Sequence, residues 1–264
     1  MTAALRFTTS WDDGHPLDLR VADMLAARGF AGTFYVPRDN REGRPVMTDD
    51  ELRRLAAGFE IGGHSIDHVM LTGLAPRELD HQLRDGKRRL EDVLGRAITG
   101  FCYPGGAHDR GIRDAVQAAG FRYARTVTNL SLDPPRDRFR VPTTLQLFPH
   151  ARMTYLKNFA RRGDWRSRGV PLAICLRDGS LDSCLERLLR FAVARGGVFH
   201  LWGHSWELES HGLWGALDRF LGVAAGLVAR EHRLSNAGAV GGDAARPAGG
   251  RLRGRRDPRH RGRR

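Results

Sequence analysis

Segments typical of strands alternate with segments typical of helices along most of the chain, and this order limits the fold more than any other feature. Repeated alternation favours parallel strands joined by crossover helices, so the sequence predicts an α/β protein. The predicted strands cover residues 5–10, 32–36, 59–62, 99–103, 121–124, 172–176 and 198–202. The predicted helices cover residues 17–28, 48–55, 76–94, 109–119, 181–195 and 214–230.

Three polar clusters follow strands of this series. They are Trp11-Asp12-Asp13-Gly14-His15, His64-Ser65-Ile66-Asp67-His68 and Trp202-Gly203-His204-Ser205-Trp206. Barrel enzymes built from parallel strands place their active sites at the carboxyl ends of the strands. We therefore expect the carboxylates and imidazoles of these clusters to meet in one site.

One carboxylate and two imidazoles would make an open metal site. Three such ligands leave room for water, and a bound cation there polarises a carbonyl group and activates water. His64 and His68 are four residues apart, so a helical turn would put them on one face. By itself such a pair is more often solvated, and an Asp-Asp-Gly run is more often a plain turn. A cation on one aspartate would remove the repulsion between Asp12 and Asp13, and Gly14 permits a turn that lets both face the site.

His204 is the candidate proton donor, since a third imidazole can protonate a leaving group. Trp202 and Trp206 would wall its pocket, although both could equally be core residues. His200 is a competing candidate that would share a face with His204 but lies deeper in the apolar run.

Composition adds limits on location and partners. The hydrophobic fraction is 41%, no apolar run approaches the ~20 residues of a membrane span, and no secretory signal precedes the first strand. Cys102, Cys175 and Cys184 are too few for a disulfide framework or a zinc cage of cysteines, so we expect a cytoplasmic protein without a membrane partner.

The end of the chain carries much of its positive charge. Residues 240–264 hold nine arginines and two aspartates, which is +7 of the formal +13. With so few large apolar residues the segment cannot offset its ordering entropy, so we predict a domain over 1–236 and a disordered tail over 237–264. Nucleic acid would be bound only nonspecifically, through this tail.

The clusters resemble motifs of the polysaccharide deacetylases with a NodB-like domain, carbohydrate esterase family four. Residues 10–14 look like the family's Thr-Phe-Asp-Asp-Gly, residues 64–68 fit its His-Ser/Thr-x-x-His, and residues 198–204 look like its late strand ending in a histidine. Residues 101–106 fall where the family has an Arg-x-Pro-Tyr-Gly-like loop. The resemblance implies a single-domain distorted (β/α) barrel of seven parallel strands.

The same resemblance implies roles for individual residues. Asp12 would be the general base and His204 the general acid, while Asp13, His64 and His68 would bind zinc or, alternatively, cobalt, nickel or iron. A backbone N–H of the loop from Tyr103 to Gly106, with Gly105 as the first choice, would stabilise an oxyanion. Trp202 and Trp206 would contact the substrate, a small molecule or oligosaccharide with an N-acyl group.

Three departures from the family pattern produce further hypotheses. The loop arginine that orients the base is Cys102 here, and Arg125 could replace it from the next strand end. The family's Asp-x-x-Asp-Trp motif is not evident, and Glu207 could support His204 instead. With no export signal evident, a soluble N-acetylated sugar or sugar-bearing metabolite is the more consistent substrate.

Three other functions have to be weighed against the residues of these clusters. A non-haem iron oxygenase also uses two histidines and a carboxylate, but usually on antiparallel β-folds. A basic nucleic-acid-binding protein would need a recognisable binding motif, and none is evident. A catalytically inactive sugar binder is opposed by the intact set Asp12, Asp13, His64, His68 and His204.

Overall fold

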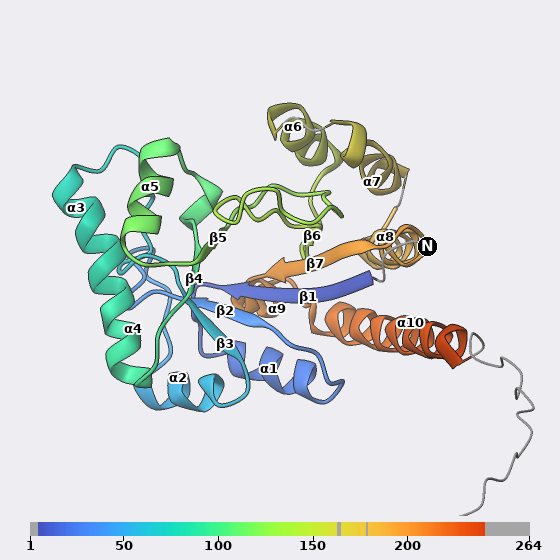
Figure 1. Cartoon of the computed structure of the whole chain (residues 1–264), viewed down its shortest axis with the longest axis horizontal. Coiled ribbons are helices and arrows are strands. Elements are labelled where there is room, and N and C mark those ends of the chain that lie inside the picture. Colours follow the sequence, from blue (N-terminus) through green and yellow to red (C-terminus); the bar gives the residue numbers. More distant parts are fainter. Residues whose placement is uncertain (1–4, 163–164, 178, 241–264) are drawn as a thin grey trace, which may run out of the picture.

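A computed structural model describes residues 5–162, 165–177 and 179–240 (Figure 1). Its strands form one sheet of seven, in the order β5-β4-β3-β2-β1-β7-β6, and every recorded pairing is parallel. The predicted α/β class and distorted (β/α) barrel are confirmed. The strands are β1 (Leu5–Asp12), β2 (Thr33–Val36), β3 (Glu60–Gly63), β4 (Gly100–Cys102), β5 (Tyr123–Arg125), β6 (Leu145–Gln146) and β7 (Gly197–Gly203).

Helices follow most strands and cover the outside of the curled sheet (Figure 1). The first group is α1 (Asp18–Ala26), α2 (Asp49–Ala56), α3 (Pro76–Asp80), the π-turn η1 (His81–Asp85), α4 (Gly86–Leu94), the 3₁₀ turn η2 (Pro104–Gly106) and α5 (Arg110–Ala118). The second is α6 (Arg152–Arg162), α7 (Trp165–Arg177), α8 (Leu181–Arg195), α9 (Ser205–Ser210) and α10 (Trp214–Val240). Among the helices of the described ranges, none combines the length and apolarity that a bilayer crossing requires.

One predicted strand is wrong. Residues 172–176 belong to α7, where Leu172 and Cys175 are buried, and the remaining strand of the sheet is the two-residue β6. A run of five apolar residues fits a buried strand and one side of a helix equally well, so periodicity could not separate them. β6 was missed because two residues show no alternation.

The sheet is open between β5 and β6, and the segment between these strands spans the gap. Thr126 N–H donates to the Val141 carbonyl at 2.9 Å, and Thr144 N–H donates to the His200 carbonyl at 3.0 Å. The segment therefore links the edge strand β5 to β7. This connection brings the carboxyl ends of the strands on the two sides of the gap toward one opening, which we call the mouth of the sheet.

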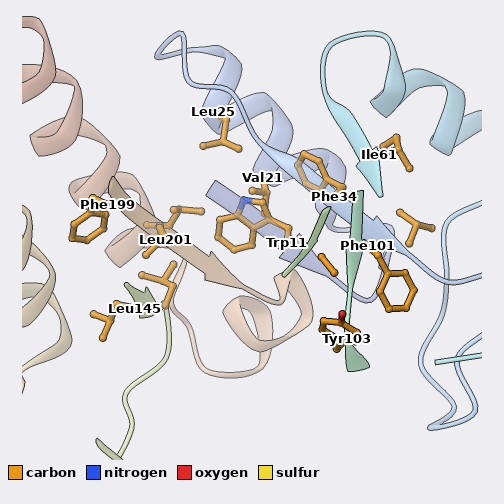
Figure 2. Close-up of a cluster of buried hydrophobic side chains, with 14 of the residues drawn as sticks. Trp11, Val21, Leu25, Phe34, Ile61, Phe101, Tyr103, Leu145, Phe199 and Leu201 are labelled. Atoms are coloured by element: carbon orange, nitrogen blue, oxygen red, sulfur yellow. The ribbon is translucent and has the colours of Figure 1, made fainter. Parts of the chain in front are cut away.

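The core lies between the sheet and its helices. Trp11, Phe34 and Leu201 come from three adjacent strands and are fully buried together (Figure 2). Burial of large side chains on neighbouring strands fixes the register, because a shift by one residue would turn each to the opposite face. The same register sets β1 against β7 so that Ser10 lies opposite Trp202.

The last described helix, α10, extends past the predicted domain boundary at residue 236. α10 ends at Val240, so residues 237–240 belong to this helix. The rest of the proposed tail, residues 241–264, lies outside the described residues. The boundary at 236 and the disorder of the tail stay predictions.

Candidate metal centre and active site

Asp13, His64 and His68 lie together at the mouth of the sheet. One potential ligand atom from each lies within 4.8 Å of the others. His68 Nε2 is 3.0 Å and His64 Nε2 is 3.5 Å from Asp13 Oδ1. This convergence is the arrangement expected of the ends of β1 and β3.

The local backbone that presents these groups is strained. Asp13, Ser65 and His68 have positive φ angles of 80°, 60° and 52°, a region that non-glycine residues seldom occupy. Such conformations cost of order 1–3 kcal/mol each and concentrate at functional sites. The packing of the two loops therefore maintains a geometry that the residues do not favour by themselves.

His64 and His68 do not share a helical turn. Residues 64–68 form a loop, and Gln82 of η1 holds it by accepting hydrogen bonds from the N–H groups of Ile66 and Asp67, each at 3.2 Å. The positive φ angles of Ser65 and His68 curl this loop so that both imidazoles reach Asp13. Spacing alone could not distinguish the curled loop from a helix.

Gly14 makes the turn after β1 possible. Its φ is +61°, and an added Cβ would lie 2.7 Å from Val36 Cγ1. We expect Gly14→Ala to lower the free energy of unfolding by at least about 2 kcal/mol, from backbone strain plus the clash. Gly29→Ala is the matched control, because Gly29 has φ +68° but open space around it, and should cost only about 1 kcal/mol. Denaturant unfolding measures both, and equal losses would contradict a steric role for Gly14.

The three groups fit a divalent cation. His64 Nδ1 donates to the Cys102 carbonyl at 2.8 Å, so in the neutral ring Nε2 is a bare lone pair facing Asp13 Oδ1. Asp13 Oδ1 is buried without a hydrogen-bond partner among the described residues. Two electron-rich atoms facing each other repel, and a cation between them would relieve this. Burial raises the pKa of Asp13. When the His64 and His68 rings are protonated instead of neutral, they donate hydrogen bonds to Asp13, outweigh burial and hold that pKa well below its usual range.

Asp12 lies beside this group in a buried position. Its Oδ2 accepts a hydrogen bond from the Cys102 thiol at 3.4 Å, and its Oδ1 has no partner in the described part of the chain. Burial raises the pKa of Asp12, while the imidazoles of His64 and His204 oppose this shift. A carboxyl with a raised pKa accepts a proton more readily than an ordinary surface aspartate.

His204 faces the same cavity from the end of β7. Its Nδ1 donates to Glu207 Oε2 at 2.7 Å, the contact suggested for Glu207 from the sequence. Burial lowers the pKa of His204, but the hydrogen bond to Glu207 and the nearby Asp13 outweigh it and raise the pKa to about 9. With this pKa the His204 ring is protonated at neutral pH. The competing His200 is buried in the sheet between the hydroxyls of Thr8 and Ser10, at 2.8 and 3.0 Å.

The two tryptophans have different positions around His204. Trp206 stacks on the His204 ring at 5.4 Å and donates from Nε1 to Asp13 Oδ2 at 2.9 Å. Trp202 meets the His204 ring edge-on and is 9% exposed. Both line a cavity of about 290 Å³ that also contains Asp12, Asp13, His64, His68 and His204.

The loop after β4 contributes Gly105 to the lining of this cavity, and one N–H group of the loop is left over. Tyr103 N–H donates to the Arg125 carbonyl and Gly106 N–H to the Tyr103 carbonyl, at 3.1 and 2.8 Å. No acceptor in the described chain is recorded for Gly105 N–H, and Gly105 lines the cavity. The Tyr103 side chain is turned into the core, where its hydroxyl donates to the Phe139 carbonyl. Tyr103 therefore positions the loop rather than the substrate.

The Arg125 side chain is not recorded in contact with the Asp12 carboxylate. Its Nη1 donates to the Pro142 carbonyl at 3.0 Å, and none of the recorded hydrogen bonds and ion pairs between described residues joins it to Asp12. The side chain that contacts Asp12 from the strand ends is Cys102, at the position of the family's arginine. Arg125 instead ties the end of β5 to the segment that spans the sheet opening.

Sequence reasoning missed the rim of the cavity on the side of His68. Glu42 Oε1 lies 3.6 Å from His68 Nδ1, and the Arg44 guanidinium lies over the Trp206 ring at 3.8 Å. Both come from the loop between β2 and α2. Loop residues follow no hydrophobic period, so no signal in the sequence pointed to them.

Part of the chain is similar in sequence to known proteins. The family model described as polysaccharide deacetylase matches residues 4–124. YxkH of Bacillus subtilis strain 168, whose name assigns it to the polysaccharide deacetylases, is 22% identical over 121 residues, which are 46% of this chain and 41% of YxkH. Residues 4–124 are therefore similar to the polysaccharide deacetylase family that the motifs resemble.

Solved structures extend the likeness of the fold beyond the matched segment. The chitin deacetylase of Colletotrichum lindemuthianum superposes with a TM-score of 0.55 at 17% identity, over 84% of this chain and 82% of that chain. A protein of Mycobacterium smegmatis, named for the same family, gives a TM-score of 0.58 at 16% identity over 85% of both chains. At these identities the superpositions establish the fold alone.

Proposed function

We propose that this protein is a metal-dependent N-deacetylase that releases acetate or a similar small acid from an amino sugar or a sugar-containing metabolite. The observation that carries the proposal is the convergence of Asp13, His64 and His68 beside a buried carboxylate, Asp12, and a protonated imidazole, His204. The match to the polysaccharide deacetylase family supports the same reaction. The parallel sheet disfavours an iron oxygenase, because the sites of those enzymes usually lie on antiparallel folds.

Asp13, His64 and His68 would hold the cation, with zinc as the first choice and cobalt, nickel or iron as alternatives. A divalent cation supplies Lewis-acid polarisation of the acyl carbonyl and activation of water when it is bound there. The Nδ1–H of His64 is fixed on the Cys102 carbonyl, so this ring keeps its Nε2 directed at the site.

The side chains of Asp12 and His204 then transfer the protons of the reaction. Asp12 removes a proton from the water that attacks the acyl carbon. Gly105 N–H donates to the carbonyl oxygen as negative charge develops on it, a contribution typically worth ~10²–10³ in rate. His204 gives its proton to the nitrogen as the carbon–nitrogen bond breaks. An acid and a free amine leave the site.

The experiment that tests this function is a panel of N-acetyl sugars, scored by acetate release. Enzyme stripped with a chelator should be inactive, and returning a divalent cation should restore acetate release. Oxygen uptake with an oxoacid in place of acetate release would support the iron oxygenase instead. The cytoplasmic location stays a proposal based on the cysteine content.

The pH dependence should respond to Glu207. Activity that needs protonated His204 is present below its pKa of about 9 and is lost as pH rises through that value. Replacing the carboxylate in Glu207→Gln removes a cause of the raised pKa, so the alkaline limb of kcat should move down by about one pH unit or more. Glu209→Gln, on the same helix but with its side chain 58% exposed, is the control. An unchanged alkaline limb in Glu207→Gln would argue against His204 as the acid.

A further inference from the structure

Two of the three cysteines meet in the fold, away from the candidate active site. Cys175 lies on α7 and Cys184 lies on α8, nine positions further along the chain, and both side chains are buried. The Cys184 thiol donates a hydrogen bond to Cys175 Sγ at 2.9 Å. Cys102 takes no part in this pair, because its thiol donates to Asp12 at the end of β4. The count of cysteines in the sequence could not show which of them meet, since this depends on how α7 packs against α8.

The pair does not fit a zinc site. Zinc in proteins takes four ligands from the chain in a structural site and three in an open catalytic site. The described residues contain one group of three or more His, Cys, Asp or Glu that could hold an ion, and it is Asp13, His64 and His68. Cys175 and Cys184 therefore have no third ligand of these types among the described residues.

The positions of the two sulfur atoms favour a disulfide. A disulfide bond is about 2.05 Å long, and the sulfur atoms of the reduced pair are already 2.9 Å apart. Bond formation therefore needs only a small approach of α7 and α8. A buried cysteine can also serve as a plain apolar side chain, but that role does not require one thiol to face another.

A cavity of about 310 Å³ gives a small oxidant access to the pair. Both cysteines line it, together with His150, Tyr155 and Ser180. Ser180 is exposed, so the cavity reaches the surface of the molecule. Its volume is far above the about 10–15 Å³ that one water molecule needs, so a peroxide fits inside. The two thiols are thus buried, yet they border a space that a small molecule can enter.

We propose that Cys175 and Cys184 are a redox-sensitive pair that hydrogen peroxide converts into a disulfide between α7 and α8. One sulfur attacks the peroxide, the O–O bond breaks, and the thiol proton passes to the departing oxygen, so that a sulfenic acid and water result. The second thiol then attacks the sulfenic sulfur, the S–S bond forms, and a second water leaves. The two thiols lose two electrons and the peroxide gains them. A dithiol reverses the reaction by thiol–disulfide exchange.

The disulfide would connect two parts of the molecule covalently. α8 packs on β1 and β7, while Arg168 of α7 donates to the Asn129 carbonyl at 2.8 Å, in the segment that spans the opening of the sheet. A cross-link between α7 and α8 would therefore join that segment to the strands. Cross-links stabilise a fold largely by limiting the freedom of the unfolded chain, so the oxidised protein should unfold at a higher temperature.

Counting thiols tests the proposal in the full-length protein. The protein is treated with hydrogen peroxide, unfolded and labelled with N-ethylmaleimide, and the labels are counted by mass spectrometry. The reduced chain should carry three labels, one for each cysteine, and the oxidised chain should carry one, on Cys102. Because trypsin cleaves after arginine, digestion without reductant should give the peptide of residues 169–177 linked to the peptide of residues 178–187. Dithiothreitol should separate the two peptides and restore three labels.

Thermal unfolding supplies a second measurement with a matched control. Oxidation should raise the Tm of the wild type by about 5 °C or more, and dithiothreitol should reverse the change. Cys184→Ala should keep both of its labels and its Tm after peroxide treatment. Ala173→Ser, at an exposed position of α7 two residues before Cys175, keeps the pair and should respond as the wild type does.

The outcomes are independent of the proposed deacetylase function. Neither Cys175 nor Cys184 lines the cavity that holds Asp13 and His204, and neither measurement uses acetate release. If no sugar releases acetate, the deacetylase function fails, and the linked peptide would still support the redox pair. Three labels on the wild type after peroxide treatment, or a linked peptide that contains Cys102, would overturn the proposal.

Discussion

Asp12→Asn should reduce acetate release about 10²- to 10⁴-fold while leaving cation binding intact. The amide has nearly the same shape as the carboxylate, so it fills the buried position between β1 and Cys102. It cannot take a proton from water. The cation ligands are Asp13, His64 and His68, which the substitution does not remove.

Acetate release and the content of bound cation are measured on the same samples. Asp23→Asn is the matched control, because the Asp23 side chain is 73% exposed on α1 and should not affect turnover. Loss of the cation together with activity would place Asp12 among the ligands instead of at the base. Turnover close to wild type would remove Asp12 from the mechanism.

His68→Ala should lose the cation and the activity together. Removing a group that supports a ligand typically weakens cation affinity 10–100-fold, so removing a ligand should weaken it by more than ~100-fold. The side chain of His68 is 11% exposed, so its truncation leaves a small opening at the rim of the cavity rather than a hole in the core. The fold should persist, as circular dichroism would check.

The control is His81→Ala, whose imidazole is 45% exposed and paired with Asp85 on η1. Equilibrium dialysis against a divalent cation, followed by acetate release, measures both effects. Cation binding equal to wild type in His68→Ala would contradict the proposed ligand set. Restoration of activity by cation in the stripped wild type but not in His68→Ala would support it.

The sheet was predictable because its signals are local. Residues 198–202 are apolar apart from His200, and residues 5–10 contain a phenylalanine and two β-branched threonines, residue types that favour strands. The helices between the strands keep a clear apolar face. In the structure Thr48 caps α2 through a capping box with Glu51, in agreement with the helix predicted over residues 48–55. The strand predicted over residues 172–176 is part of α7, because a run of five apolar residues is too short to show whether its period is that of a strand or of a helix.

The candidate site was partly predictable for the same reason. Asp13, His64 and His68 each follow a strand, and parallel strands end at the same edge, so their convergence follows from the strand order. The contact of Glu207 with His204 is also local, three residues along α9. Arg125 was misassigned because the direction of a long side chain at a strand end depends on the segment that packs against it.

The sequence by itself determined the class of fold and the chemical groups at the strand ends, because the periodicity of apolar residues and the positions of polar residues after strands are properties of the chain. Only the tertiary structure decided how those groups act. In the folded chain residues 64–68 form a loop held by Gln82, Arg125 donates to the Pro142 carbonyl, and the Cys102 thiol donates to Asp12. Each of these depends on contacts between segments far apart in the chain, whose energies no local pattern records.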